Sequence, residues 1–400
     1  MAEATCAGCG CACDDIEVTV AEGRLARVTR TCGLGDRWFA ERGGDRPPVA
    51  CVDGRAVSLD EAVDAAAAIL RQARAPLVHG LGQTSCEAQR RAVALAEAFG
   101  AVADPAGGGA ADPAYQAVGA STATFGEIRD RAELVVVWRA DPVVTNPRLL
   151  ERLRLERAAR GPRALVVVDA QRTATAEEAD AFVELDAADD FEALWTLRAV
   201  VTEAPLDRDR DGDRPLDDLA ARLRGARHAA VIHGAVDELT ALALFSLVRD
   251  LSRSRHAVTL GLRGDGNGRG AEDVLAWQTG FPAGVSFARG YPRANPGELS
   301  AAALLERGGV DAALVVTSDP LEHLPPAAGE RLRALPTVVV DARASATSRA
   351  ARVAFATAAD GIEVPGTVHR MDGVPVPLRS PLAGERPGVA DVLTAIEGRL

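Results

Sequence analysis

Three short apolar segments occur twice along the chain, in the same order and with matching ends. LVHG ending at Gly80 returns as VIHG ending at Gly234, 154 residues later, which pairs His79 with His233. LVVVWRADP and LVVVDAQRTAT, beginning at residues 134 and 165, return as ALVVTSDP and TVVVDARASAT, 178 and 172 residues later. Val-rich strands can match by chance, but the shared Asp-Pro and Asp-Ala endings indicate an internal repeat. Its growing offset places an insertion at residues 261–296.

The repeated strands alternate with segments of helical period, such as residues 87–99. This alternation is typical of α/β proteins with parallel sheets. We therefore assign residues 56–203 to a first Rossmann-like lobe. Residues 216–360, with the insertion 261–296, form the expected second lobe. The Asp-, Arg- and Pro-containing stretch 204–215 is the expected linker.

Polar and glycine residues follow the predicted strands, where ligands bind in doubly wound sheets. These strand-end residues are Gly80, Asp141, Asp169, Gly234, Asp319 and Asp341. The turn Gly80-Leu81-Gly82 before the next helix could bind phosphate through backbone N–H groups. A structural turn, with Thr84 or Ser85 capping the helix, accounts for the same sequence. Paired lobes suit one large or two-part ligand.

Five of the seven cysteines lie within the first 32 residues. The spacing Cys6-x-x-Cys9-x-x-x-Cys13, with Cys32 beyond a predicted hairpin at residues 14–31, can supply four thiolates to an iron–sulfur cluster. Zinc is the alternative, because paired cysteines are its usual ligands. Incidental thiols fit poorly with this clustering. Cys11 is a surplus thiol whose role stays open, and residues 1–55 form the expected Cys-rich, iron–sulfur-type module.

Composition excludes several kinds of protein. All 45 basic residues are Arg, so the chain has no Lys for a Walker-A loop or a Schiff base. The net charge of −12 argues against a nucleic-acid or anionic-membrane surface. No apolar run approaches the ~20 residues of a membrane helix, and the N-terminus does not resemble a signal peptide. We expect a cytoplasmic protein.

The six histidines are dispersed, and no pair has the spacing of metal ligands. His79 and His233, at repeated strand ends, are expected to be packing residues. No nucleophile elbow or HExxH motif is present. The residues alone therefore predict a metal cluster and an unidentified ligand cleft, with no visible catalytic group.

Several long segments resemble the B subunit of formylmethanofuran dehydrogenase, a member of the molybdopterin oxidoreductase superfamily. They are CAGCGCACDDIEV with Cys32, GLGQTSCEAQ, TFGEIRDRAELVVVWRADPVVTNPR, LAWQTGFPAGVSFARGYPRANPGE and DGIEVPGTVHRMDGVPVPLR. They extend from residue 6 to about residue 380, so the resemblance covers nearly the whole chain.

The resemblance implies two cofactors. One is a [4Fe-4S] cluster, whose ligands carry over to Cys6, Cys9, Cys13 and Cys32. The other is tungsten or molybdenum held by a bis-pyranopterin guanine dinucleotide between the lobes, where carbon dioxide and formate are interconverted. Gly80, Gly82, Asp141 and Asp169 are the corresponding cleft residues. Partner subunits of the A, C and D types are also implied.

The chain departs from the family at the metal site. The family's metal-ligating Cys, followed by His, falls in residues 106–111, which read AGGGAA. Arg263 of the family's later active-site segment is retained, but Asp265 and Asn146 replace histidines. A soft anionic ligand is what holds tungsten or molybdenum to the protein. The chain is therefore expected to have lost that cofactor, as in the B-type component of the bacterial formyltransferase/hydrolase complex.

Three hypotheses follow for the chain's role in one-carbon metabolism. The first is a cluster-bearing or scaffold subunit of a formyltransferase/hydrolase complex. The second is an active tungsten or molybdenum formate/CO₂ oxidoreductase with hydroxide, sulfide or Asp265 as the substitute ligand. The third is a zinc-stabilised structural subunit. Residues 361–400 are expected to form an extended arm that pairs with a partner, although they could instead fold back on the second lobe.

Overall fold

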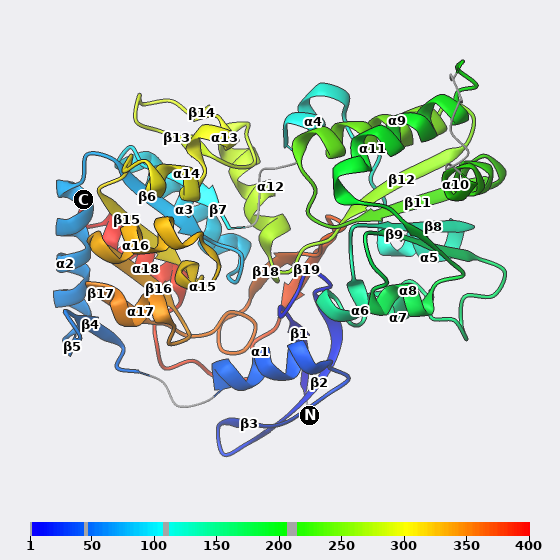
Figure 1. The fold of residues 1–400 in the computed structure, drawn as a ribbon. Coiled ribbons are helices and arrows are strands. Elements are labelled where there is room, and N and C mark those ends of the chain that lie inside the picture. The colour runs from blue at the N-terminus through cyan, green and yellow to red at the C-terminus, as the bar shows by residue number, and fades with distance from the viewer. Residues whose placement is uncertain (1, 44–46, 107–111, 206–213) are drawn as a thin grey trace. The chain divides into compact units, whose positions relative to one another are not determined.

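A computed structural model describes residues 2–43, 47–106, 112–205 and 214–400 of the chain (Figure 1). The fold is a mixed α/β arrangement that divides into two compact units. Unit 1 comprises Met1–Gly109 and Asp265–Leu400, and unit 2 comprises Ala110–Gly264. Among the described helices, none is both long enough and apolar enough to cross a bilayer.

Unit 1 is built on a nine-stranded sheet whose five central strands, β7, β6, β15, β16 and β17, are parallel. In sheet order the strands are β14 (Arg293–Ala294), β13 (Val285–Ser286), β7 (Val102–Pro105), β6 (Pro76–Gly80), β15 (Ala312–Val316), β16 (Thr337–Asp341), β17 (Val353–Ala356), β4 (Ala50–Val52) and β5 (Arg55–Ala56). The antiparallel outer strands β13 and β14 come from the predicted insertion.

Helices cover both faces of this sheet (Figure 1). They are α2 (Leu59–Gln72), α3 (Cys86–Ala98), α12 (Gly268–Thr279), α13 (Pro296–Leu299), α14 (Ala301–Glu306), α15 (Pro320–His323), α16 (Pro326–Ala334), α17 (Ala346–Ala350) and α18 (Val389–Glu397). Successive strand residues alternate between two cores. Val78 and Leu314 pack with α2, α3, α12 and α18, whereas Leu77 and Ala313 pack with α14 and α16. Burial on both faces explains the unbroken apolar runs of these strands.

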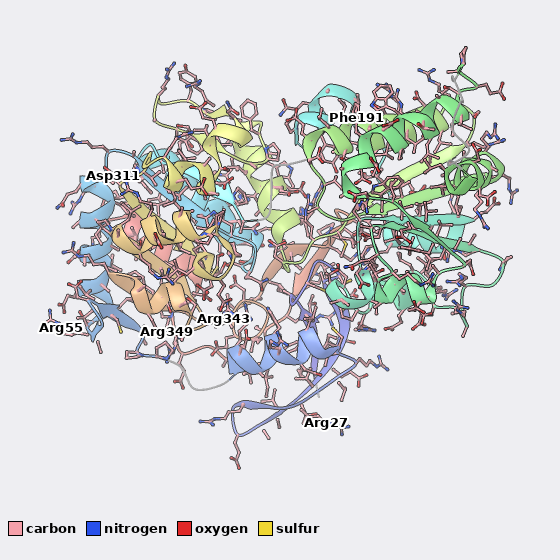
Figure 2. The ribbon with its side chains drawn as sticks, viewed as in Figure 1. Arg27, Arg55, Phe191, Asp311, Arg343 and Arg349 are labelled. Atoms are coloured by element: carbon pink, nitrogen blue, oxygen red, sulfur yellow. The ribbon has the colours of Figure 1, made fainter. Side chains whose placement is uncertain are left out.

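Unit 2 contains a five-stranded parallel sheet. Its order is β10 (Ala181–Glu184), β9 (Ala164–Asp169), β8 (Leu134–Trp138), β11 (His228–His233) and β12 (His256–Gly261). Its helices are α4 (Asp112–Val118), α5 (Phe125–Arg131), α6 (Pro142–Thr145), α7 (Leu149–Arg152), α8 (Ala174–Glu178), η1 (Ala187–Asp189), α9 (Asp190–Val201), α10 (Arg214–Gly225) and α11 (Glu238–Leu251). Phe191 of α9 is 41% exposed on the surface of this unit (Figure 2).

The repeated strands occupy equivalent positions in the two sheets. In unit 1, β6 lies beside β15, which lies beside β16; in unit 2, β11 lies beside β8, which lies beside β9. His233 pairs with Trp138, and Gly80 pairs with Val316. Trp138 and Val316 are themselves repeat partners, 178 residues apart. His233 is therefore equivalent to Gly80 rather than to His79, so the predicted alignment of that segment is shifted by one residue.

The predicted lobe boundaries, 56–203 and 216–360, differ from the observed units. Strands β6 and β7 of the first repeat copy join β15, β16 and β17 of the second, while β8, β9 and β10 join β11 and β12. The two copies have exchanged their later strands. Because repeated strands present the same apolar pattern and backbone bonds, local sequence does not determine which copy supplies the neighbour.

The N-terminal segment forms a separate three-stranded antiparallel sheet within unit 1, followed by a helix. Its elements are β1 (Ala2–Cys6), β2 (Cys13–Ala21), β3 (Arg24–Thr29) and α1 (Gly33–Gly43). The predicted hairpin is confirmed as β2 and β3. Arg27 lies on its exposed outer strand (Figure 2).

The C-terminal segment is not the expected extended arm. It forms a hairpin of β18 (Gly366–His369) and β19 (Pro375–Leu378), followed by α18. Helix α18 packs against α2 and α3, and its buried residues Val389, Val392, Leu393 and Ile396 complete the core of unit 1. These apolar side chains have helical spacing, so folding back removes them from water.

Replacing Leu393 by Ala should destabilise unit 1 by about 2–5 kcal/mol, the usual range for a fully buried Leu. Leu393 is 1% exposed, whereas the neighbouring Thr394 is exposed. Thr394→Ala is therefore the matched control and should change stability little. Urea unfolding of both variants measures the difference, and equal midpoints would show that α18 does not contribute to the core.

Candidate functional site

The N-terminal cysteines lie together around the turn between β1 and β2. Cys6 ends β1, Cys13 begins β2, and the two residues pair across the ladder. Cys9 and Cys11 lie in the turn, and all four thiols are buried. Cys32 is half-buried just before α1, where its carbonyl accepts a hydrogen bond of 2.8 Å from Asp36 N. The fold thus brings the fourth predicted ligand back to the turn.

Electrostatic coupling shows that these thiols form one group. Burial raises the pKa of Cys6 to about 12, and Cys13, Cys9 and Cys32 raise it further by charge repulsion, whereas an N–H bond from Gly8 lowers it. Hydrogen bonds with Cys13 and Cys9, together with burial, raise the pKa of Cys11 well above its usual value. The unliganded thiols are therefore protonated, and a bound metal would have to displace their protons.

Two glycines allow the backbone to approach the Cys6 sulfur. Gly8 N donates to Cys6 Sγ at 3.4 Å, as N–H groups do around sulfur ligands. A Cβ on Gly35 of α1 would lie 3.1 Å from that sulfur and 2.1 Å from Thr31 Oγ1. Trp38, 5% exposed, packs beside Gly8. The result is a compact and largely dry thiol pocket, which suits a group held by four thiolates.

At the carboxyl edge of the unit 1 sheet, the turn after β6 closes around a carboxylate. A Cβ on Gly82 would lie 2.1 Å from Asp265 Oδ2, and one on Gly268 would lie 2.2 Å from Asp265 Oδ1. Gly80 has a φ of 109°, and a Cβ there would lie 2.3 Å from Val316 O. Ser85 caps α3 by accepting from Ala88 N. The structural-turn interpretation of this sequence is thus observed, and Asp265 lies where the predicted phosphate would bind.

A buried polar network ties this turn to the C-terminal hairpin, and the sequence did not predict it. Asn267 Nδ2 donates to Thr84 O at 2.7 Å, and Asn267 Oδ1 accepts from His369 N at 2.8 Å. Asp360 accepts from the Thr84 hydroxyl at 2.5 Å and from Ser85 N at 2.8 Å. Burial raises the pKa of Asp360. Each partner comes from a distant part of the sequence, so no local signal marks the network.

In unit 2, the predicted strand-end acids are engaged in internal bonds. Asp141 accepts from Thr175 N at 2.9 Å and from Thr175 Oγ1 at 2.6 Å, and so caps α8. Asp319 makes the equivalent bonds to Thr347 in unit 1, at 3.0 and 2.5 Å. This correspondence is independent structural support for the internal repeat.

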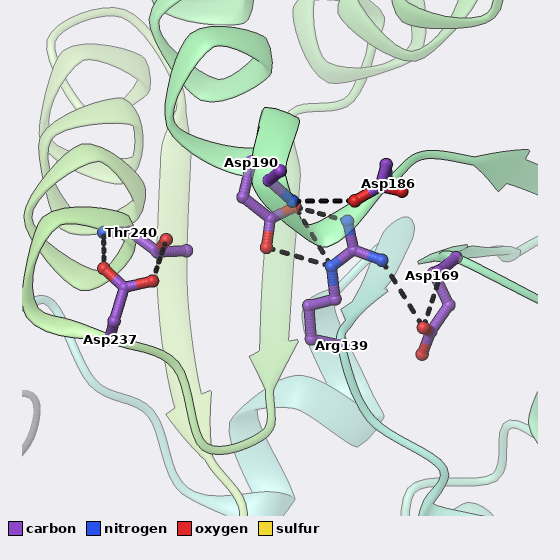
Figure 3. Close-up of polar contacts among 8 residues, drawn as sticks. Arg139, Asp169, Asp186, Asp190, Asp237 and Thr240 are labelled. Atoms are coloured by element: carbon purple, nitrogen blue, oxygen red, sulfur yellow. Dashed lines mark hydrogen bonds and ion pairs between the residues drawn. The ribbon is translucent and has the colours of Figure 1, made fainter.

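Asp169 belongs to a second internal cluster at the same edge (Figure 3). Arg139 follows β8 in the left-handed region, with a φ of 51°. Its guanidinium binds Asp190 through Nε at 2.9 Å and Nη2 at 2.7 Å, and reaches Asp169 Oδ1 at 3.4 Å. Two carboxylates around one cation leave this edge acidic, which disfavours a phosphate-bearing ligand in contact with it.

The candidate active-site residues fall into different units. Arg263 lies at the end of unit 2, where its carbonyl accepts a hydrogen bond of 2.9 Å from Asn146 Nδ2. Asp265 begins the second segment of unit 1, with Gly80 and Gly82. Residues 107–111, which include the expected position of the family's metal-ligating Cys, lie outside the described residues. His79 and His233 are buried, each 4% exposed, and burial lowers both pKa values to about 4.

No protein-family model matches the chain. Comparison with curated proteins finds the B subunit of the tungsten-containing formylmethanofuran dehydrogenase 2 of Methanocaldococcus jannaschii, 32% identical over 404 residues, 94% of this chain and 92% of that protein. The Methanococcus maripaludis protein of the same name is 30% identical with the same coverage. The B subunit of the formyltransferase/hydrolase complex Fhc of Methylorubrum extorquens is 30% identical over 363 residues, 83% of this chain and 98% of that protein.

Comparison with solved structures finds the crystal structure of the formyltransferase/hydrolase complex FhcABCD from Methylorubrum extorquens with methylofuran. A chain of that complex matches with a TM-score of 0.74 and 29% identity, over 88% of this chain and 98% of that chain. Both units and their α/β architecture therefore have a counterpart in a multisubunit complex. The chain belongs to the family of formylmethanofuran dehydrogenase B subunits, which includes the B subunit of the formyltransferase/hydrolase complex.

Replacing Gly82 by Ala should destabilise unit 1 by about 1–3 kcal/mol, because the new Cβ collides with Asp265. The double variant Gly82→Ala/Asp265→Gly should recover part of that loss. Gly126→Ala is the control, since its Cβ would meet no atom closer than 3.7 Å and its helix favours Ala. Denaturant unfolding of the three variants decides; a neutral Gly82→Ala would mean that Asp265 lies elsewhere.

Proposed function

We propose that this chain is a cluster-bearing B subunit of a formyltransferase/hydrolase-type complex and does not itself carry out redox chemistry on formate. One observation carries the proposal, namely the distribution of thiols. Five of the seven cysteines meet in the N-terminal module, and none follows Cys86. The chain thus keeps the donors for an iron–sulfur cluster and has lost the family's thiolate for tungsten or molybdenum.

The geometry of the cysteines supports a cluster over zinc. Four thiolates around zinc, with bonds of about 2.3 Å, lie roughly 3.8 Å from one another. Among the described residues, no three cysteine sulfurs lie mutually within 4.8 Å. The thiols are coupled but more widely spread, as the larger cubane requires. Cys6, Cys9, Cys13 and Cys32 would hold the cluster, and its chemistry there would be one-electron transfer or structural support.

The remaining thiols do not fit a tungsten or molybdenum ligand. Cys86 begins α3, where it is buried and accepts a bond of 3.6 Å from Asn267 Nδ2. Burial raises its pKa to about 11, which disfavours the thiolate. Cys51 lies in β4 near the opposite edge of the nine-stranded sheet from β7. We therefore derive no reaction step through a pterin-bound metal.

A specific observation favours a second candidate, an active tungsten- or molybdenum-dependent oxidoreductase. The two archaeal relatives, both named tungsten-containing, match 94% of the chain, against 83% for the bacterial Fhc protein. Hydroxide, sulfide or Asp265 would then replace the missing thiolate. The close contacts of Asp265 with Gly82 and Gly268 argue against Asp265 in that role. A zinc-stabilised scaffold is the third candidate.

Anaerobically purified protein should show the broad visible absorption of an iron–sulfur cluster. Cys9→Ser should abolish it, because a four-thiolate site loses one ligand. Cys51→Ser should leave it intact, since Cys51 lies in β4, outside the cysteine module. Absorption spectra with iron and sulfide analysis provide the measurement. A colourless protein with stoichiometric zinc would support the zinc scaffold instead.

The chain should co-purify with A-, C- and D-type subunits as a complex that contains iron but neither tungsten nor molybdenum. The complex grown with added tungstate or molybdate should still not oxidise formate with artificial acceptors, because no thiolate is present to bind either metal. Elemental analysis and a dye-reduction assay test both points. Formate-dependent dye reduction that is lost in Arg263→Ala would establish the oxidoreductase, and Arg269→Ala, of a neighbouring helical Arg paired with Asp273, is the control.

A further inference from the structure

Two histidines that are distant in sequence meet at the amino edge of the unit 2 sheet. His228 is the first residue of β11 and His256 the first residue of β12, and the two residues pair directly across the parallel ladder. Their rings are stacked, with centroids 5.2 Å apart and planes 15° from parallel. Each follows an arginine and precedes an alanine. That shared Arg-His-Ala start is the sequence signal that the search for paired histidines missed.

A carboxylate completes the group. Glu127 of α5 brings an oxygen to the two imidazoles, so that one donor atom from each residue lies within 4.8 Å of the others. In the described part of the chain this is the one group of three such donors at that separation. Ligand atoms around an ion with bonds of about 2.0–2.1 Å lie roughly 3.3 Å apart. A side-chain rotation of about one ångström would therefore close the shell.

The three donors are not engaged with one another in the described structure, in which no hydrogen bond or ion pair joins them. His228 is 7% exposed, and its Nε2 is buried without a hydrogen-bond partner. Leaving a buried ring nitrogen unbonded costs free energy that a ligand would recover. His256 is exposed and Glu127 half-buried, so an ion can reach the group from solvent.

The backbone around these residues is held in place independently of any ion. Glu133 N donates to His228 O, and His256 N donates to Arg227 O, both at 2.9 Å. The Glu133 carboxylate in turn accepts from Arg227 N at 2.9 Å. Donors on such tied elements lose little conformational entropy when they bind an ion.

We propose that Glu127, His228 and His256 form a binding site for a divalent ion of the zinc class, which clamps α5 to the amino ends of β11 and β12. Two imidazoles and one carboxylate are the donors that zinc accepts, whereas magnesium and calcium prefer oxygen ligands throughout. The site lies at the edge opposite the carboxyl ends of the strands, where ligands of doubly wound sheets bind. It is therefore a structural site, and it does not depend on the proposed role of the cysteines.

Titration of the full-length chain with Zn²⁺ and with Co²⁺ tests the site. Zn²⁺ should raise the melting temperature of the wild-type chain, since an ion that binds only the folded state stabilises it. His256→Ala and Glu127→Gln should each bind one equivalent fewer or weaken that equivalent by about tenfold or more, and should lose the rise in melting temperature. Exposed His256 and the conservative Gln leave the fold intact, which the buried His228 would not guarantee.

Co²⁺ separates this site from the cysteines, because cobalt bound to thiolate has an intense ligand-to-metal band that cobalt bound to imidazole and carboxylate lacks. The expected result is a thiolate band that is unchanged in His256→Ala while the total cobalt falls by one equivalent. Glu238→Gln, of an exposed acid on α11 in the same unit, is the control and should bind as the wild type does. Unchanged stoichiometry and melting behaviour in both His256→Ala and Glu127→Gln would overturn the proposal and assign any bound ion to the cysteines or to adventitious binding.

Discussion

The pairing of β6 with β15, and of β8 with β11, is the constraint on which the rest of the fold depends. Leu81 N donates to Val316 O at 2.8 Å, and Gly234 N donates to Trp138 O at 3.1 Å, so both units are held by equivalent bonds. Each pairing joins a strand of one repeat copy to a strand of the other. Neither sheet can form until the chain from both copies is present, because each central strand finds its neighbour far along the sequence.

The same exchange determines what the strand ends can do. After β8 and β15 the backbone turns through a left-handed residue, Arg139 or Thr317, and reaches an aspartate that caps the next short helix. The caps are shared, but the left-handed residues have diverged. Arg139 draws Asp190 and Asp169 together, whereas Thr317 leaves the corresponding edge of unit 1 without a cation at that position. Two units with one architecture thus present chemically different carboxyl edges.

Local elements of the fold and one candidate site could be predicted from the sequence, but their assembly could not. The strands, the helix after Gly80, the N-terminal hairpin and the thiol pocket follow from period, apolar runs and spacing within one turn. The lobe boundaries do not, because two copies with the same pattern offer the same partners, and the buried face of α18 acquires meaning only when α2 and α3 are beside it. Asp265, Asn267 and the stacked His228 and His256 could not be placed either. Their partners lie 28 to 183 residues away in sequence, and strand register and a loop path decide which of them meet.

The position of the cysteine module explains why a protein without redox chemistry of its own would keep a cluster. The turn that carries Cys9 and Cys11 is built into unit 1: Met371 N donates to Gly10 O at 2.9 Å, and Thr5 Oγ1 donates to Pro377 O at 2.8 Å. A Cβ on Gly266 would lie 1.9 Å from Ala7 O, so the loop before α12 fits closely against the same turn. A bound cluster would fix the path of this turn and, through it, the C-terminal hairpin and the segment containing Asp265. The cysteines would then remain under constraint for structural reasons after the thiolate for the second metal had been lost.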